Sequence, residues 1–200
     1  VLWCYDLDGV LWEYDKGSWR RGIPPEGPWY DKDSVVRTTA MAFDPRGRLW
    51  LGVDWLYYDE AAGDYVTGAG LYMWDGKRWE AFGPDHGLPA GAPTAIGADK
   101  GGRAWVAVAH KGVSVNDNGR FRTYTTADGL ASDSVRAVYC DAQERVWCGT
   151  DRGVSVFDGT KWTSYTVFDG LSDMAVNDID ADSRGRIWFA TDNGVSVLGE

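Results

Sequence analysis

The chain has 200 residues, a length that suits one domain and can bury a hydrophobic core without a disulfide scaffold. Asp and Glu number 30 against 20 Lys and Arg, so the formal net charge is -10, which argues against nucleic acid or an anionic membrane surface as a partner. No apolar run approaches the ~20 residues that span a bilayer, and we expect no membrane insertion of this chain.

A repeat of about 41 to 42 residues runs along the chain. A tryptophan marks the same repeat position in five units: Trp3, Trp50, Trp105, Trp147 and Trp188. We place the units at approximately 1–33, 34–88, 89–130, 131–171 and 172–200. Self-similarity at a fixed period of this length is typical of solenoids and propellers.

The unit 131–171 shows the predicted elements most clearly. Apolar and β-branched runs at 135–140, 145–150, 154–157 and 161–165 alternate with turn residues such as Asp158-Gly159, which favour tight hairpins. Four antiparallel strands in a repeat of about 40 residues indicate a β-propeller blade. The sequence therefore predicts an all-β, single β-propeller domain over 1–200 with about five four-stranded blades.

The first and last blades are incomplete in this chain. The first unit supplies strands two to four, and the last supplies strands one to three. Either five blades close into a ring with two trimmed members, or flanking sequence completes the propeller. We favour the compact five-bladed ring, because 200 residues hold nearly five periods.

The segment 182–195 reads Asp-x-x-Gly-Arg-Ile-Trp-x-Ala-Thr-x-x-Gly-Val, and Gly170-Leu171-Ser172 closes the unit before it. This pattern resembles the two-component regulator propeller repeat over nearly the whole chain. The resemblance implies a bacterial ligand-sensing propeller that lies outside the cytoplasm, either periplasmic or secreted. A more distant resemblance to streptogramin lyase-like propellers, seen in the Trp-Phe-Ala-Thr run at 188–191, supplies an enzymatic alternative.

Two insertions are expected on one face of the propeller. In a four-stranded antiparallel blade, the loop between strands two and three and the loop to the next blade lie on the same side. The insertion at 55–69 is in a loop of the first kind, and the insertion at 22–33 is in a loop of the second kind. Each carries aromatic and acidic residues outside the repeat pattern, which suits a glycan or another ligand with flat apolar faces.

The candidate ligand-binding residues are Trp29, Tyr30, Asp31, Trp55, Tyr57, Tyr58, Asp59, Tyr65, His86 and His110. The alternative for the second insertion is an extra hairpin, in which 55–58 pairs with 65–69 and its aromatic rings only cover the end of the blade. His86 and His110 occupy slots that hold aspartate in sister repeats, at 128 and 151. Both therefore also have an interpretation as turn variants.

We expect no catalytic residue, metal or cofactor. The motifs of serine hydrolases and nucleotide-binding loops do not occur. The spacing Asp178-x-Asp180-x-Asp182 superficially follows a calcium loop, but Asp182 is the turn aspartate of the repeat. Cys140 and Cys148 are expected as buried thiols, and a disulfide between them stays open.

The sequence therefore favours a non-enzymatic propeller that binds a small molecule, a glycan or another protein through the face with the two insertions. A structural module, in which the terminal blades are completed by another chain or by self-association, is the first alternative. A streptogramin lyase-like enzyme is the second.

Overall fold

The computed structural model describes residues 2–5, 11–21 and 35–198, which form five antiparallel sheets in chain order. We call these sheets blades 1 to 5. Blade 1 has three strands: β1 (Leu2–Tyr5), β2 (Leu11–Asp15) and β3 (Ser18–Arg21). Blade 2 has four strands: β4 (Val35–Phe43), β5 (Leu49–Asp59), β6 (Asp64–Trp74) and β7 (Trp79–Phe82).

In blades 3 to 5 the strands again pair in chain order, and the first strand of each blade is its inner strand. Blade 3 consists of β8 (Pro93–Ala98), β9 (Ala104–Val108), β10 (Val113–Asp117) and β11 (Arg120–Tyr124). Blade 4 consists of β12 (Val135–Cys140), β13 (Val146–Thr150), β14 (Gly153–Phe157) and β15 (Trp162–Tyr165). Blade 5 consists of β16 (Val176–Ala181), β17 (Ile187–Thr191) and β18 (Gly194–Leu198). Short 3-10 helices occupy Pro84–His86, Thr126–Asp128 and Val167–Asp169.

An aspartate at the turn between the first two strands organises each of blades 2 to 5. In blade 4, Oδ1 of Asp141 accepts hydrogen bonds from the backbone N–H groups of Gln143 and Arg145, both at 2.9 Å. Its Oδ2 accepts from Arg145 Nε at 2.6 Å and from Trp147 Nε1 at 2.8 Å. The Oδ2 contacts recur at three equivalent aspartates: Asp44, Asp99 and Asp182.

Three of the repeat tryptophans belong to the core between blades. Trp50, Trp105 and Trp147 are each 1% exposed. Trp105 stacks on Tyr124 of its own blade and contacts Phe157 of the next blade, with both ring centroids at 5.9 Å. Because one large ring serves two blades at once, its burial fixes neighbouring blades to each other as well as stabilising each one.

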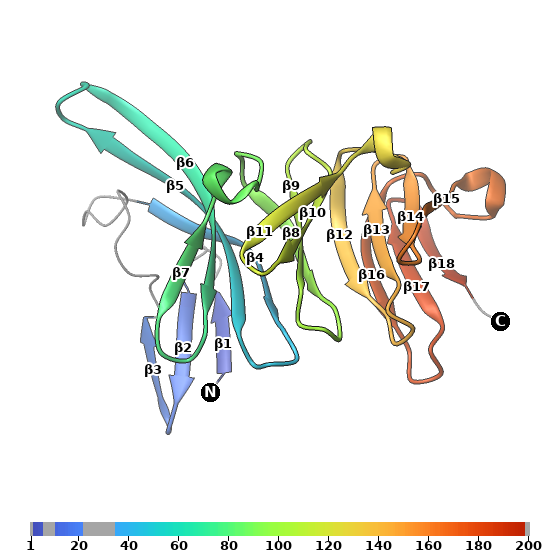
Figure 1. Cartoon of the computed structure of the whole chain (residues 1–200), viewed down its shortest axis with the longest axis horizontal. Helices are drawn as coiled ribbons and strands as arrows, with labels where there is room; N and C mark the ends of the chain where they lie inside the picture. The colour runs from blue at the N-terminus through green and yellow to red at the C-terminus, as the bar shows by residue number, and fades with distance from the viewer. Residues whose placement is uncertain (1, 6–10, 22–34, 199–200) are drawn as a thin grey trace.

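The blades form an open arc. The inner strands β4, β8, β12 and β16 follow one another, each beside the next. Blade 1 and blade 5 lie at opposite ends of the long axis, with the chain ends far apart (Figure 1). The expected compact ring is therefore wrong, because the first and last blades lie apart and do not close on each other (Figure 1).

The all-β propeller architecture is confirmed, as are the three-stranded first and last blades. The strands predicted in the unit 131–171 agree with β12 to β15 within one residue at each end. Among the described residues, no helix has the length and apolar character of a membrane span.

Candidate functional site

The most prominent departure from the repeat is the hairpin of β5 and β6, which projects from the blade body (Figure 1). Each strand has 11 residues, and the ladder pairs Trp55 with Gly68 and Tyr58 with Tyr65. The pairing of 55–58 with 65–69, expected as the alternative, is confirmed. The outer half of the hairpin extends away from the end of the blade and therefore does not cover that end.

A groove of about 700 Å³ lies at the base of this hairpin. It is bordered by Arg37 of β4, by the paired segments 54–56 and 67–69, and by residues 90–92 of the connection to blade 3. The indole of Trp55 lies against the backbone of Gly68, so closely that a Cβ at Gly68 would overlap the ring. A glycine opposite Trp55 is therefore what leaves room for the ring at this position.

One ion pair stands at the margin of the groove. Arg37 and Asp54 face each other across β4 and β5, with Nε–Oδ1 at 3.0 Å and Nη2–Oδ2 at 2.8 Å. The hydrogen bond to Asp54 holds the pKa of Arg37 above its ordinary value. This bidentate pair places both a planar donor and a carboxylate beside the ring of Trp55.

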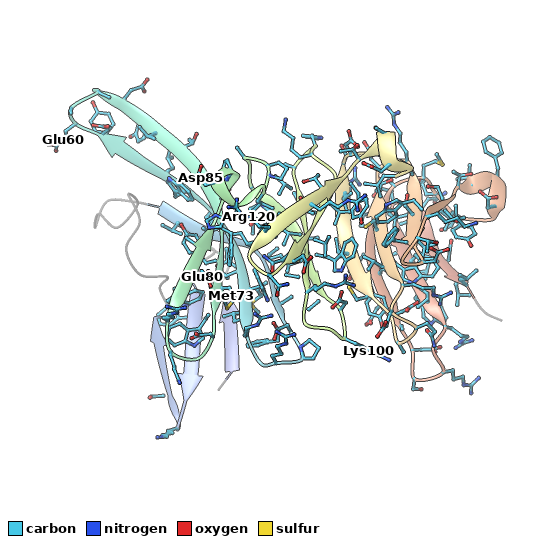
Figure 2. The ribbon with its side chains drawn as sticks, viewed as in Figure 1. Glu60, Met73, Glu80, Asp85, Lys100 and Arg120 are labelled. Carbon is cyan, nitrogen blue, oxygen red and sulfur yellow. The ribbon has the colours of Figure 1, made fainter. Side chains whose placement is uncertain are left out.

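The tip of the hairpin carries a second, separate aromatic group. Tyr58 and Tyr65 are 50% and 65% exposed and meet edge to face, with ring centroids 5.2 Å apart. Asp59 is occupied locally, because its Oδ1 accepts from the N–H groups of Ala61 and Ala62 in the closing turn. Glu60 marks this tip, far from the body of the blade, in Figure 2.

The structure therefore divides the predicted site residues. Trp55 lines the groove, whereas the tyrosine pair lies at the tip. Trp29, Tyr30 and Asp31 lie outside the described residues, as does the side chain of Tyr57.

His86 is part of a turn. Its Nδ1 accepts a hydrogen bond from the N–H of Gly83 at 3.3 Å, as Oδ2 of Asp128 does from Thr125 N in the next repeat. Its ring also meets Phe82 edge to face. The interpretation of His86 as a turn variant agrees with this geometry, and His86 is not among the residues that border the groove.

His110 is exposed and lies in the turn between β9 and β10 of blade 3, in a left-handed backbone conformation with φ of 56°. Its Nδ1 lies 2.7 Å from the hydroxyl of Ser134, which precedes blade 4. This contact links two neighbouring blades. His110 is not among the residues that line the groove, although its neighbour Ala109 donates to the carbonyl of Ala92, which is.

The groove residues that sequence reasoning missed are Arg37, Asp54 and the segment 90–92. Arg37 and Asp54 have opposite charges and become direct neighbours through strand register. The signal lies in the pairing of β4 with β5, since the ladder of the hairpin itself pairs Asp54 with Ala69.

No group of three His, Cys, Asp or Glu within the described residues could hold a metal ion. Asp182, the last member of the suspected calcium loop, accepts from Arg186 and Trp188 instead. Cys140 and Cys148 are free thiols. They are not opposed in the ladder, because Cys140 pairs with Val146 and Cys148 with Val138.

The family model described as two component regulator propeller matches residues 129–152 and 170–193. These two segments are therefore repeats of that kind, and the resemblance predicted from the sequence is confirmed there. No curated protein matches the sequence.

Solved structures share the fold. The extracellular domain of a putative hybrid two-component system from B. thetaiotaomicron aligns with 99% of this chain and 27% of its own, at 17% identity and a TM-score of 0.69. PorZ, a surface component of the type-IX secretion system of Porphyromonas gingivalis, aligns with 99% of this chain and 31% of its own, at 19% identity and 0.60. A gluconolactonase from Xanthomonas campestris aligns with 96% and 65%, at 12% identity and 0.58. The chain thus spans less than a third of the first two.

Proposed function

We propose that this chain is a non-enzymatic binding segment of a sensor-type propeller, outside the cytoplasm, with its ligand site in the groove at the base of the β5–β6 hairpin. The observation that carries the proposal is the partly exposed indole of Trp55, which lies on Gly68 beside the Arg37–Asp54 pair. The extracellular sensor domain with a similar fold supports the setting.

A carbohydrate is the ligand class that suits this groove best. A flat indole can stack on the apolar face of a sugar ring, while a guanidinium and a carboxylate can bond its hydroxyl groups. The groove is open and its volume of about 700 Å³ lies within the usual range for small-molecule sites.

The test is isothermal titration with a panel of neutral oligosaccharides. Trp55→Ala should abolish binding, and Gly68→Ala should weaken it strongly, because the new methyl group must displace the indole. Tyr65→Ala is the matched control, since it removes an exposed aromatic ring from the same hairpin and should leave affinity unchanged. If Trp55→Ala and Tyr65→Ala bound the oligosaccharides with equal affinity, the site would have to lie elsewhere.

The exposed end of blade 5 favours a second candidate function, assembly with a further blade from another chain. Val195 and Val197 of β18 are 62% and 46% exposed, whereas the equivalent Val154 and Val156 of β14 are 0% and 7% exposed. Phe168, in the 3-10 helix that connects blade 4 to blade 5, is 95% exposed. In the interior blades, a fourth strand and the next blade cover this apolar face.

A groove of about 690 Å³ lies at the same end of the arc, lined in part by Arg145, Arg186, Val197 and Leu198. An unpaired edge next to an apolar face is a ready template for β-strand addition. In this function the arc would be a building block, and the proposed ligand groove on blade 2 would stay accessible.

A further inference from the structure

The strand β18 has one edge without a partner strand among the described residues. It lies at the end of the arc, next to the C-terminus (Figure 1). In blade 4 the equivalent edge, that of β14, pairs with the fourth strand β15, and in blade 3 the edge of β10 pairs with β11. These two fourth strands therefore show which residues the same edge accepts elsewhere in the molecule.

A pair of hydroxyl groups joins the third and fourth strands in both blades. The side-chain oxygens of Ser114 and Thr123 lie 2.8 Å apart in blade 3, and those of Ser155 and Ser164 lie 2.9 Å apart in blade 4. Strand register makes Ser196 the equivalent of Ser155, because each pairs with the middle residue of the second strand. A fourth strand of the same kind would therefore place a hydroxyl group opposite Ser196.

Aromatic residues stand on both sides of this hydroxyl group in the fourth strands. In blade 4 they are Trp162 and Tyr165, and in blade 3 they are Phe121 and Tyr124. Trp162 packs against the core tryptophan of the preceding blade, Trp105, with ring centroids 6.5 Å apart. Both strands therefore have the order aromatic residue, any residue, Ser or Thr, Tyr.

Blade 5 has room for the first aromatic residue of this pattern. Leu198 of β18 is the register equivalent of Phe157, which pairs with Trp162 in blade 4. Leu198 is 37% exposed and borders the groove of about 690 Å³ at this end of the arc. A ring opposite Leu198 would therefore have open space beside it.

The turn before β18 also leaves the path of a fourth strand open. An added Cβ at Gly153, the first residue of β14, would collide with the backbone carbonyl of Tyr165 in the fourth strand. At the equivalent Gly194, the nearest atoms belong to Ser172 and are 4.0 Å away. Both glycines have nearly the same φ, 116° and 114°, so the turn of blade 5 has the shape that lets a fourth strand approach closely.

The connection from blade 4 to blade 5 shows the same difference. In the preceding connection, the carbonyl of Gly129 accepts from the hydroxyl of Ser164 at 3.4 Å, and an added Cβ at Gly129 would lie 3.2 Å from Trp162. Gly170 follows the equivalent 3-10 helix, and nothing lies within 4 Å of an added Cβ there. Two separate turns thus leave the same path open along β18.

The sequence indicates where such a strand comes from. The pattern occurs at 121–124 and 162–165 and nowhere else in the 200 residues, and both segments are already paired within their own blades. A folded second copy therefore has no such strand to give. Packing of two copies through their exposed apolar faces is a separate contact that needs no added strand.

We propose that the unpaired edge of β18 binds an antiparallel β-strand of another protein, with the order aromatic residue, any residue, Ser or Thr, Tyr. The aromatic residue lies opposite Leu198, the hydroxyl group opposite Ser196 and the tyrosine opposite Val195. The inference rests on the assembly function proposed for this end of the arc, and it names the chemistry of the partner.

The test is a titration of the ¹⁵N-labelled chain with a synthetic peptide that has the sequence of residues 158–166. NMR shifts should saturate at the backbone amides of β18 and of Gly170, while those of β14, which keeps β15 as its partner, should stay unchanged. A peptide of the same composition in scrambled order is the matched control and should give no saturable shift.

Changes within the peptide test the pattern on an unaltered chain. Ser164→Ala in the peptide should weaken binding about three- to tenfold, because the hydrogen bond to Ser196 is lost. Trp162→Ala in the peptide should weaken it by about tenfold or more, because the large buried ring is lost. Thr163→Ala changes the position that the pattern leaves free and should not alter the affinity.

Two variants of the chain test the approach at the turn. Gly194→Ala should weaken binding by about tenfold or more, because its Cβ would meet the backbone of the incoming strand. Gly159→Ala is the matched control, since this glycine also has positive φ and nothing lies within 4 Å of an added Cβ. It should bind the peptide as the wild type does. Circular dichroism checks that both variants are folded, and the peptide series decides the question if Gly194→Ala is not.

Equal binding of the 158–166 peptide and the scrambled peptide would overturn the pattern, and assembly at blade 5 would then lack sequence selectivity. Shifts confined to β14, or no saturable shift at β18, would overturn the partner strand itself. Assembly through the exposed face is still measured separately by the mass of the chain in solution, and oligosaccharide binding at Trp55 is independent of both.

Discussion

Asp141 and Trp147 are joined by a buried hydrogen bond, with Nε1 of the indole donating to Oδ2 of the carboxylate at 2.8 Å. The same oxygen atom accepts from Arg145 Nε at 2.6 Å, and the guanidinium lies over the indole ring, 5.1 Å from its centroid. One carboxylate thus connects a surface turn, a cation and the core of the blade interface.

Asp141→Ala should destabilise the protein by about 2–4 kcal/mol, because it leaves the N–H of Trp147 buried without a partner and removes a charge-assisted bond to Arg145. Urea unfolding measures this change. Asp117→Ala is the control, since Asp117 is exposed and, within the described part of the chain, accepts only from its neighbour Asn118. A similar loss in both variants would contradict a special role for Asp141.

Acid should weaken the same contact in blade 5. Burial raises the pKa of Asp182, but hydrogen bonds from Arg186 and Trp188 outweigh this effect and lower it from 3.8 to about 2. A carboxyl group whose pKa is lower in the folded state stabilises the fold above its unfolded pKa, and this contribution is lost as the pH falls through the folded pKa. The stability difference between wild type and Asp182→Asn should therefore shrink between about pH 4 and pH 2. Thermal unfolding over this range tests the prediction, and a constant difference would contradict it.

Gly153→Ala should be much more disruptive than Gly159→Ala. Both glycines have positive φ, at 116° and 95°, so both substitutions strain the backbone by about 1 kcal/mol. Only at Gly153 would the new Cβ collide with a backbone carbonyl, that of Tyr165, whereas nothing lies within 4 Å of the Cβ at Gly159. Paired melting curves should show a clearly lower Tm for Gly153→Ala, and equal Tm values would refute the close approach.

Polar substitution at the end of blade 5 should reduce self-association without loss of stability. Phe168→Ser combined with Val195→Thr removes exposed apolar surface, so light scattering should show a lower average mass if assembly occurs through this face. Val154→Thr is the matched change at the equivalent buried position, and it should cost about 1–2 kcal/mol through burial of a hydroxyl group. An oligomer that persists in the double variant would exclude this face.

The thiols of blade 4 should be unreactive in the folded protein. Burial raises the pKa of Cys140 to about 12 and that of Cys148 well above its ordinary value, so neither forms much thiolate at pH 8. Alkylation by iodoacetamide, read by peptide mapping, should label both only after unfolding in urea. Fast labelling of either in native buffer would show that the blade opens locally.

The repeat was readable from sequence because each of its signals is local. The turn aspartate, the arginine four residues on and the tryptophan six residues on lie within one hairpin, so their spacing predicts their contact. The same holds for His86, whose slot indicated a role in a turn, where the structure shows its Nδ1 accepting from the N–H of Gly83.

The arc and the two pockets could not be read in this way. Ring closure depends on the angle between blades, which arises from the fit of whole side-chain layers and has no local signature. The predicted site residues lie in two places for a related reason. Strand pairing puts Tyr58 and Tyr65 at the tip of the hairpin and Trp55 at its base.

By itself, the sequence determined the blades, their order and their tryptophan core, because these depend on periodicity and turn chemistry within about 42 residues. Only the tertiary structure decided where space remains between blades. Trp55 borders a groove that Gly68 and Gly91 also line, and Asn116 borders a pocket between blades 2 and 3 because Asn116 and Phe121 stand where the next blade has Phe157 and Trp162. Such spaces are set by residues far apart in the chain, whose distances only packing can fix.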